Sequence, residues 1–554
     1  MVIICFTIVF SHRQTGEQNL FAGIITNVSF SGYHGQQNSI IITGASPTIK
    51  LAGKPAMDSF MDLPLQQIVN EAVENSGNGA AVTANPKFGS KLDYVCQYNE
   101  NCWDFLNRLS YQYGEWLMYD GQTTCFGMKF GSGTTLEYDK EMTHFDLSAN
   151  LSPQKFNRYQ YLKHDDKEID EDDPSDVPGV RGYLQVSKGR SESIYTSDVT
   201  APLIPDINTK KDLNDLVKAE KSRAVGEMLI MRGKTQTCKV KIGETVKIRL
   251  PEKMDIPIKS VDTFLVTQIT HTIDMEGHYS NSFEGIIDGI EAIPMAEPRL
   301  PVAMPQLATV KTNEDERKRG RVKVQTSWQK AKNKTSNWIR VQTPDAGKSD
   351  DVPKNRGFVH IPEKDDLVML GFEFGDPSRP FVMGSMFSEL VSEGGGEGNH
   401  IKSIRDKSGT EVVMNSKDGS YKVFSPKGQT TFFADGKGNV SISTPNTVSI
   451  TCSDFKVNTS NSIVLDSKPG KNGGKGTIDA TAHKTMSLKT ETDNFSVESQ
   501  TKAISLKAKT DFSASSETAS MKLQAAKDAK IESSDTKINA SSSIRIKSGD
   551  TDVI

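Results

Sequence analysis

The sequence predicts a mainly β, multidomain protein with an α+β first part, a small barrel and a repetitive β structure at the C-terminal end. Three observations predict this class. Roughly the first 300 of the 554 residues alternate strand-like runs with a few amphipathic helices. Residues 302–387 contain only short strand-like runs, and residues 440–546 repeat a two-residue apolar motif. The length allows several domains, at roughly 150 residues each.

The first part of the chain shows both the alternating apolar pattern of strands and the three-to-four-residue apolar spacing of helices. Alternation predicts strands over residues 21–28, 39–43, 237–250 and 263–273, and a hairpin over 115–127 that turns at Asp120-Gly121. Apolar residues at helical spacing predict one helix from Leu65 to Val73, with Asp62 as N-cap. They predict a second that stops at Gly114, and a third over 210–231. This mixture predicts an α+β domain with barrel subdomains.

Two segments between these elements indicate loops or boundaries. Residues 165–173 contain seven acidic residues and one lysine, without the spacing of a calcium loop, and we expect a solvated loop there. Residues 294–305 contain four prolines and form a stiff linker. We therefore divide the chain into three domains, residues 1–298, 299–388 and 389–554.

The opening apolar run, residues 1–10, lacks a basic leader and a cleavage site and is half the length of a membrane span. We expect a buried strand there and no ordinary signal peptide. The six cysteines match no zinc pattern, which indicates free thiols and assembly in a reducing cytoplasm. The net charge of −4 gives no electrostatic case for binding nucleic acid or an anionic membrane.

The second domain reads as a small barrel. Runs at 320–325, 338–343, 367–372 and 381–385 are short strands, and about five strands in ~85 residues fit an OB-fold. Such barrels often bind nucleic acid or glycans, and the basic run Arg317-Lys318-Arg319 with Arg321 and Trp328 could form a patch for them. Arg319 and Arg321 can equally pair with Glu314 and Glu316, and a binding module would not need the repeat that follows.

That repeat consists of apolar-x-apolar pairs, mostly seven to nine residues apart and separated by Ser, Thr, Asn, Asp and Lys. A Gly-Lys-rich stretch at 468–476 interrupts it. The clear pairs are Val440/Ile442, Val448/Ile450, Phe455/Val457, Ile463/Leu465, Met486/Leu488, Phe495/Val497, Ile504/Leu506, Met521/Leu523 and Ile544/Ile546. The weaker pairs are Ile478/Ala480, Phe512/Ala514, Ala529/Ile531 and Ile538/Ala540.

Each pair places two side chains on one face of a short strand, which is too little to close a core within one chain. Three chains wound together solve this, because each supplies one face of a triangular prism. Thirteen strands at ~4.8 Å spacing make a rod of about 60 Å. A disordered tail is the alternative, but disorder has no period. We expect the core of the prism to contain Ile442, Ile450, Val457, Leu465, Leu488, Val497, Leu506, Leu523, Ile531 and Ile546.

Several motifs together resemble the valine-glycine repeat (VgrG) family, the tip spikes of type VI secretion systems. The first stretch comprises residues 97–100, 103–109 and 113–116. The second joins Gly320–Gln325 to Trp338–Val341. The most specific is Gly371–Ser385, which contains Gly-Asp-Pro-Ser-Arg-Pro, and residues 402–409 follow. The resemblance implies a ring-shaped hub, an OB-fold neck and a three-chain needle. The family has more strands before residues 21–25, so the first barrel of the hub is expected to be shortened.

The resemblance also implies the function: a homotrimeric spike that punctures target envelopes and carries a tip cap and effectors. It would be assembled in the bacterial cytoplasm and expelled to the extracellular space or into target cells. Its implied partners are Hcp-like tube rings, baseplate proteins, effector proteins and, transiently, the target membrane. A PAAR-repeat tip protein would cap the end at Thr551, Asp552, Val553 and Ile554. The spike of an extracellular contractile injection system or of a phage-like tail is an open alternative.

Motifs for catalysis are missing from the sequence. It contains no His-Glu-x-x-His, P-loop, Gly-x-Ser-x-Gly or paired-cysteine pattern, and no His-x-His of the kind that holds iron in a needle tip. The ~50 residues between Phe387 and Val440 are too few for a lysozyme domain. We therefore predict no catalytic, metal or cofactor site and no enzymatic activity. An adhesin stalk would need a secretory signal and an anchor, and we find neither.

Overall fold

The computed structural model describes residues 5–12, 16–32, 39–127, 131–163, 165–251, 261–389, 393–394, 396–468 and 476–546. Strands account for 34% and helices for 14% of it, which confirms the predicted mainly β class. Contacts divide the chain into two units, residues 1–447 and residues 448–554. Among the described residues, none of the helices combines the length and apolarity needed to cross a bilayer.

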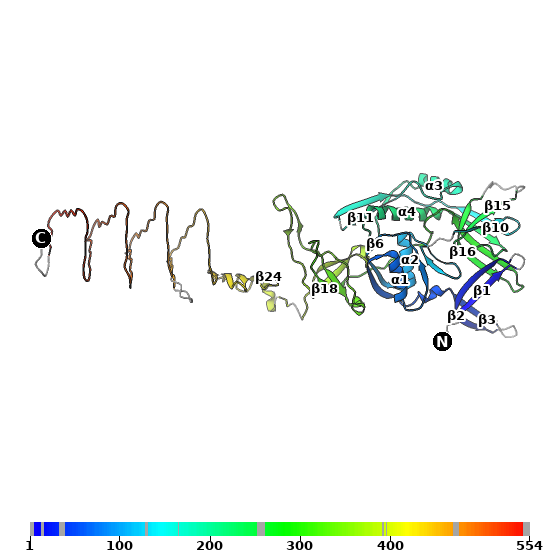
Figure 1. Ribbon diagram of the computed structural model, residues 1–554, viewed down its shortest axis with the longest axis horizontal. Helices are drawn as coiled ribbons and strands as arrows, with labels where there is room; N and C mark the ends of the chain where they lie inside the picture. The colour runs from blue at the N-terminus through cyan, green and yellow to red at the C-terminus, as the bar shows by residue number, and fades with distance from the viewer. Residues whose placement is uncertain are drawn as a thin grey trace. The chain divides into compact units, whose positions relative to one another are not determined.

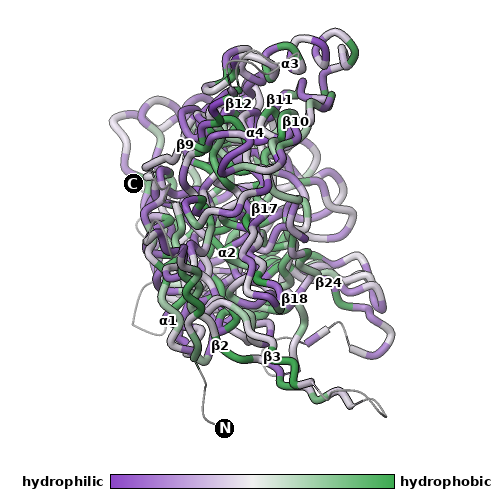
Figure 2. The backbone as a smooth tube through the Cα atoms, turned by 90° about the vertical axis from the view of Figure 1, so that its right-hand side faces the viewer, coloured by the Kyte–Doolittle hydropathy of each residue, from purple (hydrophilic) through white to green (hydrophobic). Residues whose placement is uncertain are grey.

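The first unit begins with a three-stranded antiparallel sheet in the order β1-β2-β3 (Figure 1), made of β1 (Cys5–Ser11), β2 (Gln18–Ser31) and β3 (Ser39–Ala45). All three strands were predicted, but the prediction that the opening run is buried was wrong. Ile8 is 42% exposed, and in β1 only Phe10 is buried, where it stacks on His271. The chain is coloured as hydrophobic beside the β2 and β3 labels in Figure 2, and the side chains there are exposed.

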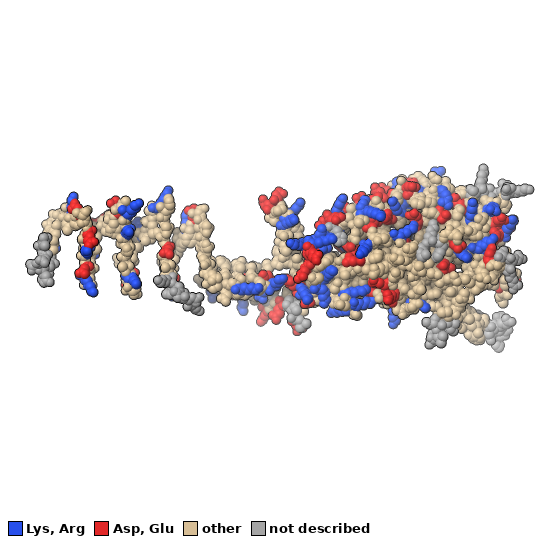
Figure 3. Space-filling view, in the orientation of Figure 1, with Lys and Arg blue, Asp and Glu red and all other residues tan. Residues whose placement is uncertain are grey.

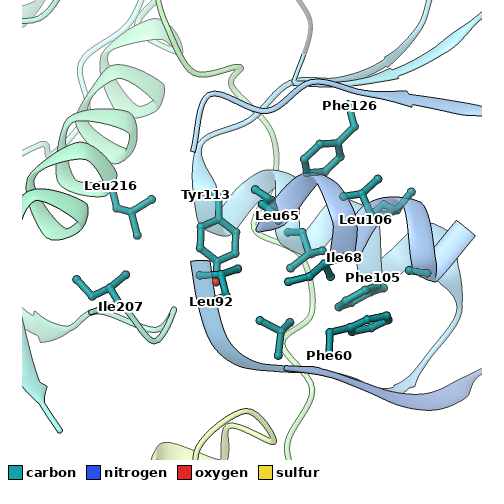
Figure 4. Packing of buried hydrophobic residues seen from close by; sticks show 14 of the residues in the cluster. Phe60, Leu65, Ile68, Leu92, Phe105, Leu106, Tyr113, Phe126, Ile207 and Leu216 are labelled. Carbon is teal, nitrogen blue, oxygen red and sulfur yellow. The ribbon is translucent and has the colours of Figure 1, made fainter. Parts of the chain in front are cut away.

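The two predicted N-terminal helices pack face to face with a two-stranded sheet to form the first core (Figure 4). These elements are α1 (Leu65–Asn75), α2 (Cys102–Tyr113), β4 (Ala56–Pro64) and β6 (Lys91–Glu100). Helix α2 ends, as predicted, at Gly114 in the left-handed conformation (φ 68°). The predicted cap of α1 was wrong, because Pro64 precedes the helix and Asp62 lies in β4.

A six-stranded sheet in the order β10-β14-β17-β16-β15-β9 carries the second core. Helix α4 (Lys210–Gly226) ends five residues before the predicted Met231, because residues 229–235 form a central strand of this sheet. The predicted strand over 237–250 is confined to β15. The strands are β9 (Gly133–Glu137), β10 (Met142–Ala149), β14 (Leu229–Thr235), β15 (Thr245–Arg249), β16 (Thr263–Ile273) and β17 (Tyr279–Ile287).

The acidic segment is a hairpin strand and not the predicted loop. β12 (Lys167–Asp172) pairs antiparallel with β11 (Phe156–Leu162), which also pairs with β13 (Val199–Pro202). Lys210 and Lys221 of α4 form ion pairs with Glu171 and Asp173, so opposite charges from a helix offset the acidic strand. The remaining elements before residue 300 are η1 (Pro47–Lys50), β5 (Val82–Ala84), β7 (Leu117–Tyr119), β8 (Thr124–Phe126) and α3 (Gly182–Ile194).

Residues 306–387, called the OB barrel below, form a four-stranded sheet in the order β19-β18-β22-β23. The predicted strand at 338–343 makes only isolated bridges, Ile339 to Val322 and Val341 to Val382, but these join the two edges of the sheet and close the barrel. Its elements are β18 (Gln306–Thr312), β19 (Lys323–Thr326), η2 (Ser327–Lys332), β20 (Ala346–Gly347), β21 (Arg356–Gly357), β22 (Leu367–Phe372), η3 (Glu373–Gly375) and β23 (Pro380–Ser385).

After η4 (Glu397–Asn399) the first unit ends in an antiparallel sheet of five consecutive strands, called the meander below. Its strands are β24 (Ile401–Arg405), β25 (Glu411–Asn415), β26 (Ser420–Ser425), β27 (Thr430–Ala434) and β28 (Val440–Ser443). The sequence motifs located its beginning and its last strand, but we did not expect a sheet within the chain here. In the second unit, the described residues 448–468 and 476–546, called the repeat segment, contain neither helix nor strand and are all exposed. Figure 1 shows them as an open trace that turns repeatedly.

Candidate assembly surfaces

The meander has one strongly apolar face. Its register places one apolar side chain of each strand directly opposite the next, in a continuous row across all five strands: Ile404, Val412, Val423, Phe432 and Ile442. The residues two positions away on the same face include Met414, Tyr421 and Val440. Because successive side chains alternate between faces, the whole row belongs to one side of the sheet.

This apolar face lacks a second layer. Ile404 is 53% and Ile442 is 60% exposed, and Met414 and Val440 are exposed as well. A single sheet is stable only when its apolar face is covered. Ile442, predicted as a core residue of the prism, pairs across the strands with Phe432 and remains exposed on this face.

In the repeat segment, the predicted core residues are likewise exposed. Their exposed fractions run from 49% for Val457 to 86% for Leu523, and the structure brings none of the nine together. Among the described residues, its backbone makes no hydrogen bonds to other backbone groups. Apolar burial is worth roughly 25 cal/mol per Å², so the exposed apolar surface and the unpaired backbone leave a large stabilisation unrealised in a single chain.

Four ion pairs show how side chains alternate in the repeat segment. Lys468–Asp466 (3.1 Å), Lys489–Glu491 (3.7 Å), Lys537–Asp535 (3.6 Å) and Lys530–Glu532 each join residues two positions apart. Residues at this spacing share a face only in extended backbone. In all four cases the charged residues have the opposite parity to the neighbouring apolar pair. The ion-paired charges therefore lie on the face opposite the neighbouring apolar pairs, and Figure 3 shows both signs of charge interspersed along this segment.

The apolar pairs also compensate for one another in volume. Each pair that begins with Phe continues with a small residue, as Phe455/Val457, Phe495/Val497 and Phe512/Ala514 show. Pairs that begin with Met continue with Leu, as Met486/Leu488 does. Pairing a large side chain with a smaller one in this way is typical of a close-packed core.

The predicted tip-cap residues Thr551, Asp552, Val553 and Ile554 lie outside the described residues. Their role in binding a cap stays a prediction.

The most specific sequence motif forms a joint between the hub (residues 1–298) and the OB barrel. Ser378 Oγ accepts a hydrogen bond from the backbone N–H of Cys96 at 3.1 Å. The Arg379 guanidinium donates to the carbonyl oxygens of Leu203 and Pro205 at 2.9 and 3.1 Å. Arg379 is 3% exposed, and burial raises the pKa of the neighbouring Asp376 above its usual range. The motif therefore fixes the barrel to the hub through buried polar contacts.

A second set of contacts completes this joint. Gln329 Nε2 donates to Ser59 Oγ (2.9 Å) and Tyr94 Oη (3.0 Å). Lys332 and Lys334 each donate to Asp58 at 2.6 Å, and Asp58 is buried. Burial raises the pKa of Asp58, but the hydrogen bonds from the two lysines outweigh it and hold the pKa below its usual value.

The basic-aromatic patch that could have bound nucleic acid is engaged in contacts within the chain. Arg321 binds Asp315 through two hydrogen bonds of 2.7 and 2.9 Å, and this contact lowers the pKa of Asp315. Arg319 donates to the carbonyl oxygen of Lys163, and Trp328 donates to Gln306. The expectation that Arg319 and Arg321 pair with Glu314 and Glu316 was wrong about the partners, because Arg321 pairs with Asp315 and Arg319 donates to a backbone carbonyl.

Groups with catalytic or metal-binding potential are few in the described part of the chain. Burial raises the pKa of the Cys96 thiol to about 12, which makes it inert. Cys5 and Cys452 are exposed and the other four cysteines are buried, all as free thiols. Asp274, Glu276 and His278 gather at an exposed turn, and they pair with one another. We assign no chemistry to these groups.

Together, the closed barrel, its buried joint to an α+β hub and the exposed, unpaired repeat segment indicate an injector-type spike. Comparison with known proteins agrees: residues 306–387 match the family described as the type VI secretion system/phage-baseplate injector OB domain. The type VI secretion system spike protein VgrG1b of Pseudomonas aeruginosa is 23% identical over 466 residues, which cover 74% of this chain. These two findings confirm the predicted resemblance to the VgrG family. The chain spans 58% of the length of that relative.

Solved structures with partial overlap include an Escherichia coli type VI secretion component described as similar to bacteriophage T4 tail proteins. It is 15% identical, with 68% of this chain and 86% of that chain covered and a TM-score of 0.44. A chain of a Francisella PdpA–VgrG complex is 7% identical, with 80% of this chain and 81% of that chain covered and a TM-score of 0.46. At these scores we draw nothing further from either overlap.

Proposed function

We propose that this chain is the structural tip spike of a contractile injection machine, and that it works as a homotrimer. The repeat segment is the observation that carries this proposal. Its apolar pairs lie on one face, its ion pairs lie on the other, and its backbone makes no hydrogen bonds to itself in the described residues. Two further copies of the chain would cover the apolar face and pair the backbone at once.

The mechanism is mechanical. In the trimer, each strand hydrogen-bonds to strands of the other two chains, so the rod is cross-linked along its length and resists bending. The meander supplies a broader apolar face at the beginning of the rod, with the row from Ile404 to Ile442 turned toward the other two chains. The buried joint at Arg379 holds the barrel on the hub, so that force applied to the hub reaches the needle.

The partners follow from this role. The hub docks on a tube of Hcp-like rings within a baseplate, and a PAAR-repeat protein caps the end at residues 551–554. Effector proteins travel on the cap or on the rod, and the target membrane is a transient contact. The spike is assembled in the bacterial cytoplasm and expelled, and it has no enzymatic activity of its own. The name of the Pseudomonas relative supports a type VI system. The family description also includes phage baseplates, so a phage-like or extracellular injection particle is the second candidate.

Two substitutions at neighbouring positions test the proposal. Leu506 belongs to the apolar pair Ile504/Leu506, and Ser505 lies between the two, on the other face of the strand that we propose for the rod. Leu506→Asp buries three charges in the rod, so we expect loss of the trimer, measured by light scattering, and rapid proteolysis of the repeat segment. Ser505→Asp places the same charge outside and should leave both unchanged. Equal effects of the two variants would contradict the proposal, since no inner face would then exist.

A further inference from the structure

The hub contains a buried carboxylate, that of Glu115, with one oxygen that nothing satisfies. Glu115 is 2% exposed, and its Oε1 atom accepts a hydrogen bond from the backbone N–H of Phe88 at 2.8 Å. Its Oε2 atom is buried and has no hydrogen-bond partner in the described part of the chain. An ionised group buried without a full set of partners destabilises a fold, and burial raises the pKa of this carboxyl. The free oxygen therefore indicates a missing donor.

The backbone holds Glu115 firmly in this position. The residue follows Gly114, where α2 ends in the left-handed conformation. Its N–H donates to the carbonyl oxygen of Ser110 at 2.9 Å, and its own carbonyl oxygen accepts from Ser110 Oγ at 2.7 Å. A Cβ on Gly114 would lie 2.3 Å from the Cβ of Ala219, so α2 and α4 are in direct contact here. The carboxylate is thus fixed at a packed junction of two helices.

Glu115 lines a cavity of about 520 Å³ between the end of α2, the loop 87–90 and the first half of α4. A water molecule occupies about 30 Å³, so the cavity has room for an organic group. Two aromatic rings belong to its lining, Phe88 and Tyr113, and their centroids lie 4.9 Å apart. Leu216 and Ala219 of α4 add apolar surface, and Figure 4 labels Tyr113 and Leu216.

The lining of the cavity selects among possible donors. Its second buried acid, Asp212, is already satisfied, because it accepts from Ser90 Oγ at 2.5 Å and from Thr209 Oγ1 at 2.8 Å. Calcium and magnesium ions need about six oxygen ligands or more, and the buried lining, as far as it is described, offers one free carboxylate oxygen. An ammonium group needs fewer acceptors, and aromatic rings attract it as well.

The lysines of the chain do not supply this ammonium group. Lys87, Lys211 and Lys218 lie at the cavity and are all exposed. Within the described residues, none of the three donates to the free oxygen of Glu115. The charge of Lys87 acts on the carboxylate from a distance and does not replace a hydrogen bond.

We propose that this cavity binds an organic ammonium group, either of a small free amine or of a lysine side chain. Glu115 accepts its hydrogen bonds, Phe88 and Tyr113 pack beside the charge, and Leu216 and Ala219 cover the carbon chain that carries it. The site lies within the hub of one chain. The inference therefore goes beyond the proposed function and does not depend on the trimer.

Thermal unfolding of the full-length protein tests the proposal, followed by tryptophan fluorescence because Trp103 and Trp116 lie in the hub. The probes are n-butylammonium chloride and lysine capped as Nα-acetyl-lysine-N-methylamide. We expect at least one of them to raise the melting temperature by about 2 °C. Norleucine with the same caps has a matching carbon chain without the ammonium group, and should give no rise at equal concentration and ionic strength.

Two variants locate the effect. Glu115→Gln keeps an oxygen for the N–H of Phe88 and should lose the rise, because a neutral amide does not hold an ammonium group in a buried site. Asp215→Asn removes the same charge from an exposed residue of the cavity and should keep it. If Glu115→Gln does not fold, the comparison of capped lysine with capped norleucine on the wild type still decides.

The outcomes separate the two sources of the ammonium group. A larger rise with capped lysine assigns the site to a lysine side chain of a partner protein, and a larger rise with butylammonium assigns it to a free amine. No rise with either probe, or equal rises in the wild type and Glu115→Gln, would overturn the inference, since water alone would then serve Glu115. The mass of the chain in solution tests the spike separately, so that failure of one leaves the other standing.

Discussion

Arg379 shows how much one side chain contributes to the joint between hub and barrel. Its guanidinium serves two carbonyl oxygens from a position that is 3% exposed, and Asp376 and Asp206 lie close to it. Both hydrogen bonds come from the terminal nitrogen Nη2. A lysine side chain ends one bond before that position, so its ammonium falls short of the two carbonyls and leaves at least one of them unpaired.

We therefore expect Arg379→Lys to lower the free energy of unfolding by about 1–3 kcal/mol, the cost of an unpaired buried polar group. Urea unfolding followed by tryptophan fluorescence measures it, because Trp328 and Trp338 lie in the barrel. Arg340→Lys is the matched control, since the Arg340 side chain is 42% exposed, and should change stability by less than about 0.5 kcal/mol. Equal losses would mean that Arg379 does not hold the joint.

Asp58 makes the same joint sensitive to acid. Its pKa is held below its usual value by Lys332 and Lys334, despite burial. A lowered folded-state pKa gives stability that is present above the ordinary aspartate pKa of about 4 and is lost as the pH falls through the folded-state value. The melting temperature of the wild type should exceed that of Asp58→Asn at about pH 6. This difference should shrink toward about pH 3, and a constant difference would contradict the assignment.

Among the elements, helix α2 was predictable because its sequence states both ends: Asn101 caps it and Gly114 ends it in the left-handed conformation. The end of helix α4 could not be predicted from the sequence in this way. Met228, Leu229 and Met231 continue the apolar pattern beyond the helix, but the pairing of residues 229–235 with two distant strands decides their structure. Such pairing is a tertiary contact that local periodicity cannot report.

The meander was missed although its sequence contains a usable signal. Glycines at 409, 419, 428 and 438 mark turns about ten residues apart, each flanked by short alternating runs. We took the repeat to begin only at Val440, because the pairs there are regular. The acidic strand β12 was wrongly predicted to be a loop because of its negative charge. Lys210 and Lys221, which lie far along the chain, offset that charge in the folded structure.

Volume compensation in the apolar pairs gives a prediction at this scale. Val497→Leu adds a methylene in each of three chains beside Phe495, which should overpack the core and destabilise the trimer by roughly 1–3 kcal/mol. Phe495→Leu combined with Val497→Leu recreates the Ile504/Leu506 type of pair and should recover most of the loss. Thermal unfolding of the trimer measures both. A double variant less stable than the single one would show that the paired positions do not share a layer.

For the whole molecule, the two units differ in what they need. Residues 1–447 contain three buried cores of their own. Residues 448–554, as far as they are described, contain none and consist of exposed backbone with one apolar face. The sequence repeat predicted that one chain forms no core here, since two inward side chains per strand cannot form a core alone. That two further chains complete the core stays a proposal. Which surfaces of hub and barrel meet in the assembly could not be predicted, because exposed apolar residues there follow no period.

The mass of the purified chain in solution tests the central claim most directly. Light scattering should give about 183 kDa, three times the 60.9 kDa of one chain. A truncation after Gly396, which removes the meander and the repeat, should weaken or abolish the trimer. A full-length monomer of 60.9 kDa whose C-terminal part is nevertheless folded and protected from proteolysis would contradict the three-chain rod, and with it the puncturing mechanism.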